Sequence, residues 1–394
     1  MPDALSPSAT AADHARSTAI RGSAWCDFDL HGMVGIRLVG ASPDDRAAVA
    51  RQLGPIASAL AREPDIVIRF VERLRRDTPL ELIGLDDTAY TGDDFFLLRA
   101  RHKARTRVQI AFDAIGGRCE IVCERGVPAV PLLLAIVNLT VLARGGLALH
   151  ASAFRYRGTG VLVTGWSKGG KTELLLGFVE HGAEYIGDEW IYITPEGDRM
   201  YGIPEPIRVW DWQLEQLPRY WEEIGAAESL RLATLRQAHR VTAGIANTPA
   251  AHRMGGRRPL RRLADLIDRQ RYAFLAPART FGAEASALAG SIDRVVFVGS
   301  SEDRRTRLEP VSASWIAERM VHSLAEERSG LLASYRRFRF AFPHRANPLL
   351  DGAAQVEQER LHRVLADKPC YALLHPYPPS IRELFETAAP IIPA

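Results

Sequence analysis

The chain has 394 residues, of which 47 % are hydrophobic and 25 % are charged. These average values exclude a globally disordered, collagenous or coiled-coil protein, and the length allows two to three domains. Fifty lysines and arginines face 47 aspartates and glutamates, which gives a formal net charge of +3. A dedicated nucleic-acid binder with a dominant basic surface is therefore not expected.

The sequence shows no sign of secretion or of a membrane anchor. Residues 1–21 have no apolar run, so they predict a disordered tail and no signal peptide. The longest apolar run, 127–143, contains a proline and an asparagine and is shorter than a membrane-spanning helix. The four cysteines form no CxxC pair, so we expect buried reduced thiols and no zinc site. We expect a cytoplasmic protein without a membrane or nucleic-acid partner.

Residues 22–125 predict a small N-terminal α/β domain. Runs of β-branched and apolar residues indicate strands within 28–39 and at 66–71, 108–112 and 119–123, while 43–62 has helical spacing. No set of catalytic side chains is recognisable here. We therefore expect a structural or substrate-docking role for this domain.

Residues 126–310 predict an α/β core, and 311–394 predict a helical C-terminal region. A buried helix over 132–144 ends at two glycines, and strands at 147–154 and 161–164 lead to a helix over 171–180. Strands at 190–193 and 292–298 flank an arginine-rich, irregular stretch with a helix over 260–274. The C-terminal region predicts helices at 314–332, 349–365 and 379–387.

The stretch Gly165-Trp-Ser-Lys-Gly-Gly-Lys-Thr172 matches the phosphate-loop pattern GxxxxGK[ST]. Its backbone amides and the start of the next helix would form a cradle for phosphate. Lys171 is expected to contact the β- and γ-phosphates of ATP, and the Thr172 hydroxyl to ligate Mg²⁺. A chance glycine turn with a surface lysine is the alternative, but the strand before the loop and the helix after it favour nucleotide binding. The predicted nucleotide-binding residues are Gly165, Ser167, Lys168, Gly169, Gly170, Lys171 and Thr172.

Three further residues are candidates for the chemistry. Asp188 and Glu189 follow an apolar pair one helix after the loop, where acidic side chains bind the metal or accept a proton. Such pairs elsewhere usually lie solvated in turns. His150 lies on the strand before the one that leads into the loop, and a purely structural role is its alternative.

The segments Leu149–Ala153, Gly160–Glu173 and Gly187–Glu189 together resemble the catalytic core of the HPr kinase/phosphorylase family, with its spacings from His150 to the loop and to Asp188. The resemblance implies a mixed-sheet P-loop kinase core shared with phosphoenolpyruvate carboxykinase. It also implies that ATP and Mg²⁺ are bound, that Asp188 is the general base, and that Glu189 is second at the metal. His150 would lie near the transferred phosphoryl group, and homo-oligomers are implied because the relatives form them.

The expected activity is therefore an ATP-dependent phosphoryl transfer to a hydroxyl group. The acceptor would be a serine of a peptide or protein, or a small molecule, in a natural-product or peptide-modification pathway. Lys168 stands where the family has a loop glycine, which favours one alternative, a nucleotide-binding regulator without turnover. A carboxykinase-like enzyme acting on a small metabolite is the other.

Arginines gather around Gly255-Gly256. Guanidinium groups on a glycine-hinged segment suit stabilisation of a transferring phosphoryl group or recognition of an acidic substrate. The alternative is a solvated charged helix in which acidic residues offset them. The arginines are Arg253, Arg257, Arg258, Arg261 and Arg262.

Overall fold

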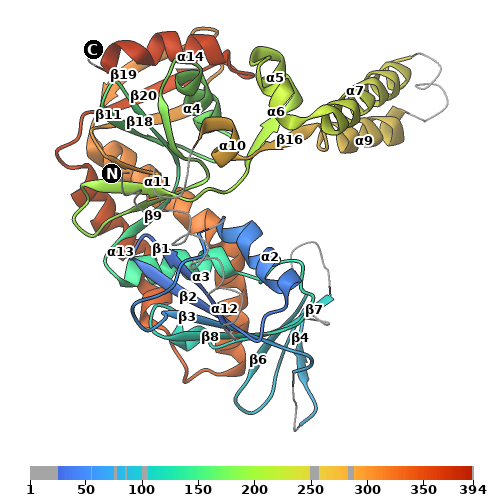
Figure 1. The fold of residues 1–394 in the computed structure, drawn as a ribbon, viewed down its shortest axis with the longest axis vertical. Coiled ribbons are helices and arrows are strands. Elements are labelled where there is room, and N and C mark those ends of the chain that lie inside the picture. The colour runs from blue at the N-terminus through green and yellow to red at the C-terminus, as the bar shows by residue number, and fades with distance from the viewer. Residues whose placement is uncertain are drawn as a thin grey trace, which may run out of the picture. The chain divides into compact units, whose positions relative to one another are not determined.

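The structure is a computed structural model that describes residues 25–54, 56–74, 78–84, 87–99, 105–248, 257–282 and 288–392. The predicted tail, 1–21, lies outside these residues. The fold is mixed α/β, as predicted, with both parallel and antiparallel strand pairs. The chain divides into two compact units, and each is described by itself (Figure 1). Unit 1 comprises the chain up to 148 together with 324–360, and unit 2 comprises 149–323 together with 361–394.

Unit 1 is built on an eight-stranded sheet in the order β1-β2-β3-β8-β7-β6-β5-β4. β2, β3 and β8 are parallel neighbours, and burial alternates along β3 and β8 because successive side chains point to opposite faces. Ser42 and Asp45 begin α2 with a reciprocal capping box. The elements are β1 (Trp25–Leu30), β2 (Val34–Val39), α2 (Pro43–Leu53), β3 (Ile66–Val71), β4 (Glu81–Ile83), β5 (Thr88–Tyr90), β6 (Phe95–Arg99), β7 (Arg105–Ile110), β8 (Cys119–Glu124), α3 (Leu133–Ala143), α12 (Ser329–Ala341) and α13 (Pro348–Leu365).

Unit 2 contains a six-stranded sheet, β12-β10-β11-β18-β20-β19, a four-stranded sheet, β17-β14-β13-β9, and a ribbon of β15 and β16. β11, β18 and β20 are parallel, so their carboxyl ends lie at one edge of the sheet. The strands are β9 (Leu147–His150), β10 (Ser152–Tyr156), β11 (Thr159–Thr164), β12 (Glu184–Gly187), β13 (Trp190–Ile193), β14 (Arg199–Gly202), β15 (Ile207–Trp210), β16 (Tyr272–Leu275), β17 (Ala289–Ser291), β18 (Arg294–Ser300), β19 (Arg307–Val311) and β20 (Cys370–His375). The helices are α4 (Lys171–Glu180), α5 (Asp211–Gln216), α6 (Tyr220–Ile224), α7 (Ala226–Ala246), α9 (Arg257–Asp268), α10 (Pro277–Phe281), α11 (Ala313–Glu327) and α14 (Ile381–Ala388).

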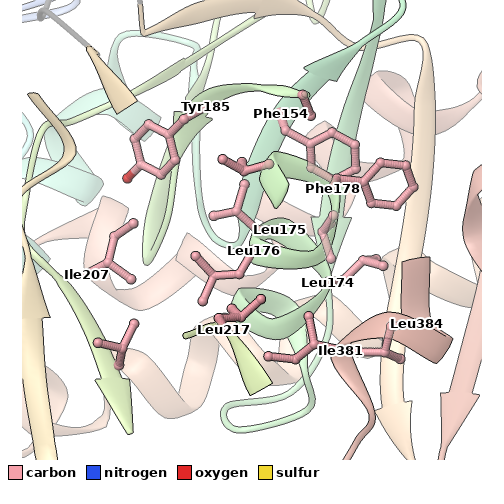
Figure 2. Close-up of a cluster of buried hydrophobic side chains, with 14 of the residues drawn as sticks. Phe154, Leu174, Leu175, Leu176, Phe178, Tyr185, Ile207, Leu217, Ile381 and Leu384 are labelled. Carbon is pink, nitrogen blue, oxygen red and sulfur yellow. The ribbon is translucent and has the colours of Figure 1, made fainter. Parts of the chain in front are cut away.

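The hydrophobic core of unit 2 fixes the start of α4 against the sheet. Apolar side chains of α4 pack between β10 and α14, as Figure 2 shows for Leu174, Leu175 and Phe178. The rings of Phe154 and Phe178 stack with their centroids 4.4 Å apart. Burial of each apolar side chain of this size stabilises the folded state by about 1.5–3 kcal/mol. The loop before α4 is thus attached to a rigid helix and a rigid strand.

The C-terminal part differs from the sequence prediction. The segment expected to be helical, 311–394, also contains β20, which lies between β18 and β19 in the six-stranded sheet. The arginine-rich stretch between the predicted strands 190–193 and 292–298 was expected to be irregular apart from one helix, but it contains the long helix α7. The predicted helix 260–274 ends at Asp268 before β16. A helix boundary at Arg328 also divides the predicted helix 314–332 into α11 and α12.

The cysteines agree with the expectation of buried thiols at three of the four positions. The four cysteines are free thiols, and Cys119, Cys123 and Cys370 are buried. Burial raises the pKa of Cys119 and of Cys123 to about 12, so both stay protonated.

Within the described ranges, no helix combines the length and apolar character needed to cross a membrane.

Candidate active site

The predicted phosphate loop joins β11 to α4 at the edge where three parallel strands end. Gly165 has φ 147°, and a Cβ there would lie 2.3 Å from the carbonyl oxygen of Val298 on β18. Gly170 has φ 105°, and a Cβ there would lie 2.4 Å from the ring of His375 on β20. Both positions therefore require glycine, because a side chain would be strained and would collide with the neighbouring strand.

The two loop lysines have different environments. Lys171 is buried, and its Nζ donates hydrogen bonds to the carbonyl oxygens of Gly165 (3.3 Å) and Trp166 (3.0 Å). Lys168 is exposed and has φ 63°, a left-handed conformation that favours glycine. Lys168 thus keeps the backbone shape of a loop glycine while adding a cationic side chain. Ser167 beside it is also exposed.

Thr172 and Asp188 lie in direct contact. Thr172 Oγ1 in the first turn of α4 donates to Asp188 Oδ2 at 2.9 Å. Asp188 is 2 % exposed, and burial together with the charge of Glu189 raises its pKa to about 7. The hydrogen bond from Thr172 and the charge of Lys171 oppose that rise without cancelling it. Asp188 is therefore a carboxylate whose proton affinity suits proton transfer near neutral pH.

His150 and Glu189 form the second polar contact of the site. His150 Nε2 lies 3.0 Å from Glu189 Oε2, and the amide of Ala151 donates to the Glu189 carbonyl at 3.1 Å. The bond from His150 is the main reason why the pKa of Glu189 is lowered. Glu189 has φ 65°, an unusual backbone conformation that such contacts must stabilise. Glu189 therefore remains charged while neighbouring Asp188 takes the proton.

Neighbouring strands explain why these residues, distant in the chain, meet. β10 pairs with both β11 and β12, and Ala153 lies opposite Gly187. Ser152 Oγ also donates to the carbonyl oxygen of Lys171 at 3.1 Å, which attaches β10 to the first turn of α4. β10, which begins two residues after His150, therefore joins the phosphate loop and the acidic pair in one arrangement.

Two residues near the site were missed by the sequence analysis. His375, at the end of β20, has Nε2 at 2.8 Å from the Gly169 carbonyl oxygen and Nδ1 at 2.7 Å from that of Pro376. Burial, followed by the charges of nearby Glu189 and Asp188, raises the pKa of Glu205 well above its usual value. Its Oε1 is buried without a hydrogen-bond partner among the described residues. His375 can be found only from the strand pairing of β20. Glu205 could have been found from the sequence, because it is an acidic residue between two prolines.

The arginines predicted as a weaker feature are placed by α9. Arg258, Arg261 and Arg262 lie on this helix, which packs along α7, while Arg253 and the Gly255-Gly256 hinge fall outside the described residues. The solvated charged helix is therefore the description that fits these residues in the structure.

The donor set fits the nucleotide and metal that the resemblance implies. The threonine hydroxyl and two carboxylates are oxygen donors, which Mg²⁺ prefers, and Mg²⁺ usually takes one or two carboxylates together with substrate phosphates. The described residues contain no cluster of three or more histidine, cysteine or acidic side chains that could hold a metal ion. Thr172, Asp188 and Glu189 are the residues that would hold Mg²⁺ beside the loop.

Comparison with known proteins gives one partial match. No protein-family model matches the chain. HPr kinase/phosphorylase of Mycoplasma mycoides subsp. mycoides SC is 40 % identical over 58 residues. The matched stretch covers 15 % of this chain and 18 % of that relative, so the chain matches less than a fifth of the relative's length. The match supports a distant relationship to HPr kinase/phosphorylase.

Proposed function

We propose that the protein is an ATP-dependent kinase that transfers a phosphoryl group to a hydroxyl. The observation that carries this proposal is the 2.9 Å hydrogen bond between Thr172, in the first turn after the phosphate loop, and the buried carboxylate of Asp188. This bond supports the proposal, because a hydroxyl that would bind the metal and a carboxylate that would accept a proton meet beside the loop that would bind phosphate. The partial similarity to HPr kinase/phosphorylase supports the same class of reaction.

The loop residues bind and orient the nucleotide in this proposal. Lys171 exchanges its bonds to the carbonyl oxygens of Gly165 and Trp166 for bonds to phosphate oxygens, and the loop amides supply the remaining donors. Bound MgATP supplies the transferable phosphoryl group and a cation that offsets its charge. Because these groups are fixed before the nucleotide binds, little reorganisation is needed during transfer.

Asp188 accepts the proton of the attacking hydroxyl. The acceptor oxygen forms a bond to the γ-phosphorus, the bond from that phosphorus to the β–γ bridging oxygen breaks, and ADP leaves. The proton of the hydroxyl passes to Asp188, whose pKa of about 7 suits this role. His150 fixes Glu189 at 3.0 Å, and so keeps a second charge beside the transferred group. A serine in a peptide or protein, or a hydroxyl of a small molecule, is the proposed acceptor.

The test uses radiolabelled ATP and two substitutions. Lys171→Ala should abolish nucleotide turnover, whereas Asp188→Asn should retain ATP binding and lose transfer. Lys368→Ala is the matched control, since Lys368 precedes β20 at the edge of the sheet opposite the loop. Mass spectrometry then detects a phosphate adduct on candidate peptides and metabolites. Full transfer by Asp188→Asn would show that the base is assigned wrongly.

A nucleotide-binding regulator without turnover is the second candidate. The left-handed, exposed Lys168 favours it, because a cationic side chain at this point of the loop could hold ATP without promoting transfer. Lys168→Gly should leave a true kinase active, and ATP consumption measured with and without acceptor candidates separates the two functions. ATP binding with no consumption under any of these conditions would favour the regulator.

A further inference from the structure

Two helices of unit 2 form an insertion that the proposed phosphotransfer does not use. In the chain, α7 and α9 lie between β15 and β16, which pair with each other as a two-stranded ribbon. The two helices run side by side and project away from the sheets of unit 2 (Figure 1). α7 also packs on α6 and β16, whereas α9 packs mainly on α7. We call residues 226–248 and 257–268 the helical pair.

The helical pair exposes an unusual share of apolar side chains. Five of the ten large hydrophobic side chains that remain exposed in the described part of the chain lie on these two helices. They are 47–70 % exposed, although Leu232, Ala246 and Ala264 on the same helices are buried. Clusters of exposed apolar side chains mark interaction surfaces more often than isolated ones do. The five are Leu230, Val241, Ile245, Leu263 and Leu266.

The apolar side chains recur at helical spacing. Val241 and Ile245 are four residues apart on α7, and Leu230 lies eleven residues, or about three turns, before Val241, on the same side of the helix. Leu263 and Leu266 are three residues apart on α9. Each helix therefore presents an apolar stripe to solvent in addition to the stripe that packs against its neighbour.

The same helices concentrate positive charge. They carry seven arginines against three acidic residues, a formal charge of +4, whereas the whole chain carries +3. Four of the arginines begin α9, whose first turn contains no acidic residue. Cations at a helix N-terminus oppose the helix dipole, and arginines four residues apart repel each other. This arrangement of positive charges destabilises α9, and an anionic partner would reduce the destabilisation.

Two of the seven arginines, Arg231 and Arg236, form ion pairs with carboxylates. No carboxylate contacts the guanidinium groups of Arg240, Arg258 or Arg262 within the described ranges, and Asp268 pairs with Arg271 at 2.8 Å instead. Arg261 contacts the neutral amide oxygen of Asn247 at 3.3 Å. From these observations we propose that the helical pair is a docking surface for an acidic polypeptide segment that carries apolar side chains.

Other partners fit these helices less well. Residues 226–268 contain no phenylalanine, tyrosine or tryptophan, whereas helices that lie on membranes use tryptophan and phenylalanine, and single-stranded nucleic acids stack on aromatic rings. A second helical pair of the same chain would bring +4 against +4 and be repelled. An acidic polypeptide with leucines at helical spacing satisfies both the charge and the apolar stripes.

The test measures fluorescence anisotropy of a labelled peptide of glutamate, leucine and alanine, with leucines at helical spacing, on the full-length protein without ATP. Binding should weaken with added salt, and Arg258→Glu with Arg262→Glu should weaken it at least about tenfold. Leu263→Ser with Leu266→Ser should weaken it comparably. The control, Arg51→Glu with Arg336→Glu, makes the same charge change at exposed helical arginines of unit 1 and should bind normally.

Several outcomes would overturn the proposal. Equal loss of binding in the control variant would mean that only net charge matters. Equal binding of a peptide with the same composition but irregular leucine spacing would remove the role of the apolar stripes. Preferential binding to phosphatidylglycerol vesicles, or a change of oligomeric state in the helical-pair variants, would assign the surface to a membrane or to a second copy.

Discussion

Asp188 and Glu189 are adjacent in the chain, yet burial and hydrogen bonding give them opposite protonation behaviour. Burial and the charge of Glu189 raise the pKa of Asp188 to about 7, while the contact with His150 lowers the pKa of Glu189. A base must be ionised to accept a proton, so transfer should increase as pH rises from about 6 to about 8 and then level off. The pH profile of kcat/KM measures this directly, and a flat profile across that range would contradict the assignment of Asp188 as base.

The same raised pKa predicts that ionised Asp188 lowers the free energy of unfolding. An unfolded aspartate has a pKa of about 3.9, so between roughly pH 4 and 7 the folded state binds the extra proton and stability falls as pH rises. An asparagine side chain carries no charge at any of these pH values, so Asp188→Asn should raise the free energy of unfolding at pH 8 by roughly 2 kcal/mol. The gain should vanish near pH 4. Thermal unfolding at both pH values tests this, with Asp367→Asn, at an exposed turn residue, as the control.

At the scale of elements, the phosphate loop depends on two strands that follow it far along the chain. The carbonyl oxygen of Val298 on β18 leaves no room for a side chain at Gly165, and the ring of His375 on β20 leaves none at Gly170. Both ring nitrogens of His375 face carbonyl oxygens, at 2.8 Å and 2.7 Å. Because carbonyl oxygens only accept, a ring nitrogen that carries a proton donates to the carbonyl oxygen it faces. His375 is thus a positioning residue that joins the loop to the end of β20.

Substitution of His375 should affect nucleotide binding more than overall folding. In His375→Ala, the Gly169 carbonyl loses its donor and the loop loses a fixed contact, so ATP affinity should fall by about tenfold. His375→Gln, which can donate one hydrogen bond, should restore part of the affinity. Calorimetric ATP titration measures both, with His322→Ala on α11 as the control. Unchanged affinity in His375→Ala with an intact thermal transition would exclude the positioning role.

The elements around the loop could be predicted because their signals are local. An apolar strand, a glycine-rich loop and a helix follow one another within about twenty residues, and Asp188 follows at a family-like spacing. β20 could not be predicted, because its neighbour β18 lies some seventy residues earlier and strand pairing leaves little trace in one sequence. For the same reason His375 was missed. α7 was missed because its arginines and exposed apolar residues obscure the helical periodicity.

At the scale of the whole molecule, neither unit is a continuous stretch of chain. The chain enters unit 2 at 149, leaves it within α11, and returns to it within α13. The predicted boundary at 310/311 therefore separates β18 from β20, its parallel partner, although both belong to one sheet. The predicted domains follow each other in order along the chain, whereas the core of unit 2 is completed by its last strand and helix.

This organisation predicts a selective effect of C-terminal truncation. A chain ending at Asp367 lacks β20 and α14, so the sheet loses the strand between β18 and β19, and α4 loses the packing of Ile381 and Leu384. Unit 2 should then fail to fold, while unit 1 keeps all of its elements. Differential scanning calorimetry should show the unit 1 transition alone.

Tryptophan fluorescence gives an independent reading of the same truncation. Six of the seven tryptophans lie in unit 2, so their emission should shift to that of solvent-exposed indole when the truncated chain is made. Ile121→Ala is the reciprocal control, because Ile121 is fully buried on β8 of unit 1. The smaller side chain should lower the free energy of unfolding of unit 1 by about 2–5 kcal/mol. That variant should lower the unit 1 transition and leave the fluorescence of unit 2 in place. Two intact transitions in the truncated chain would show that unit 2 folds without β20, because the remaining five strands would then suffice for its core.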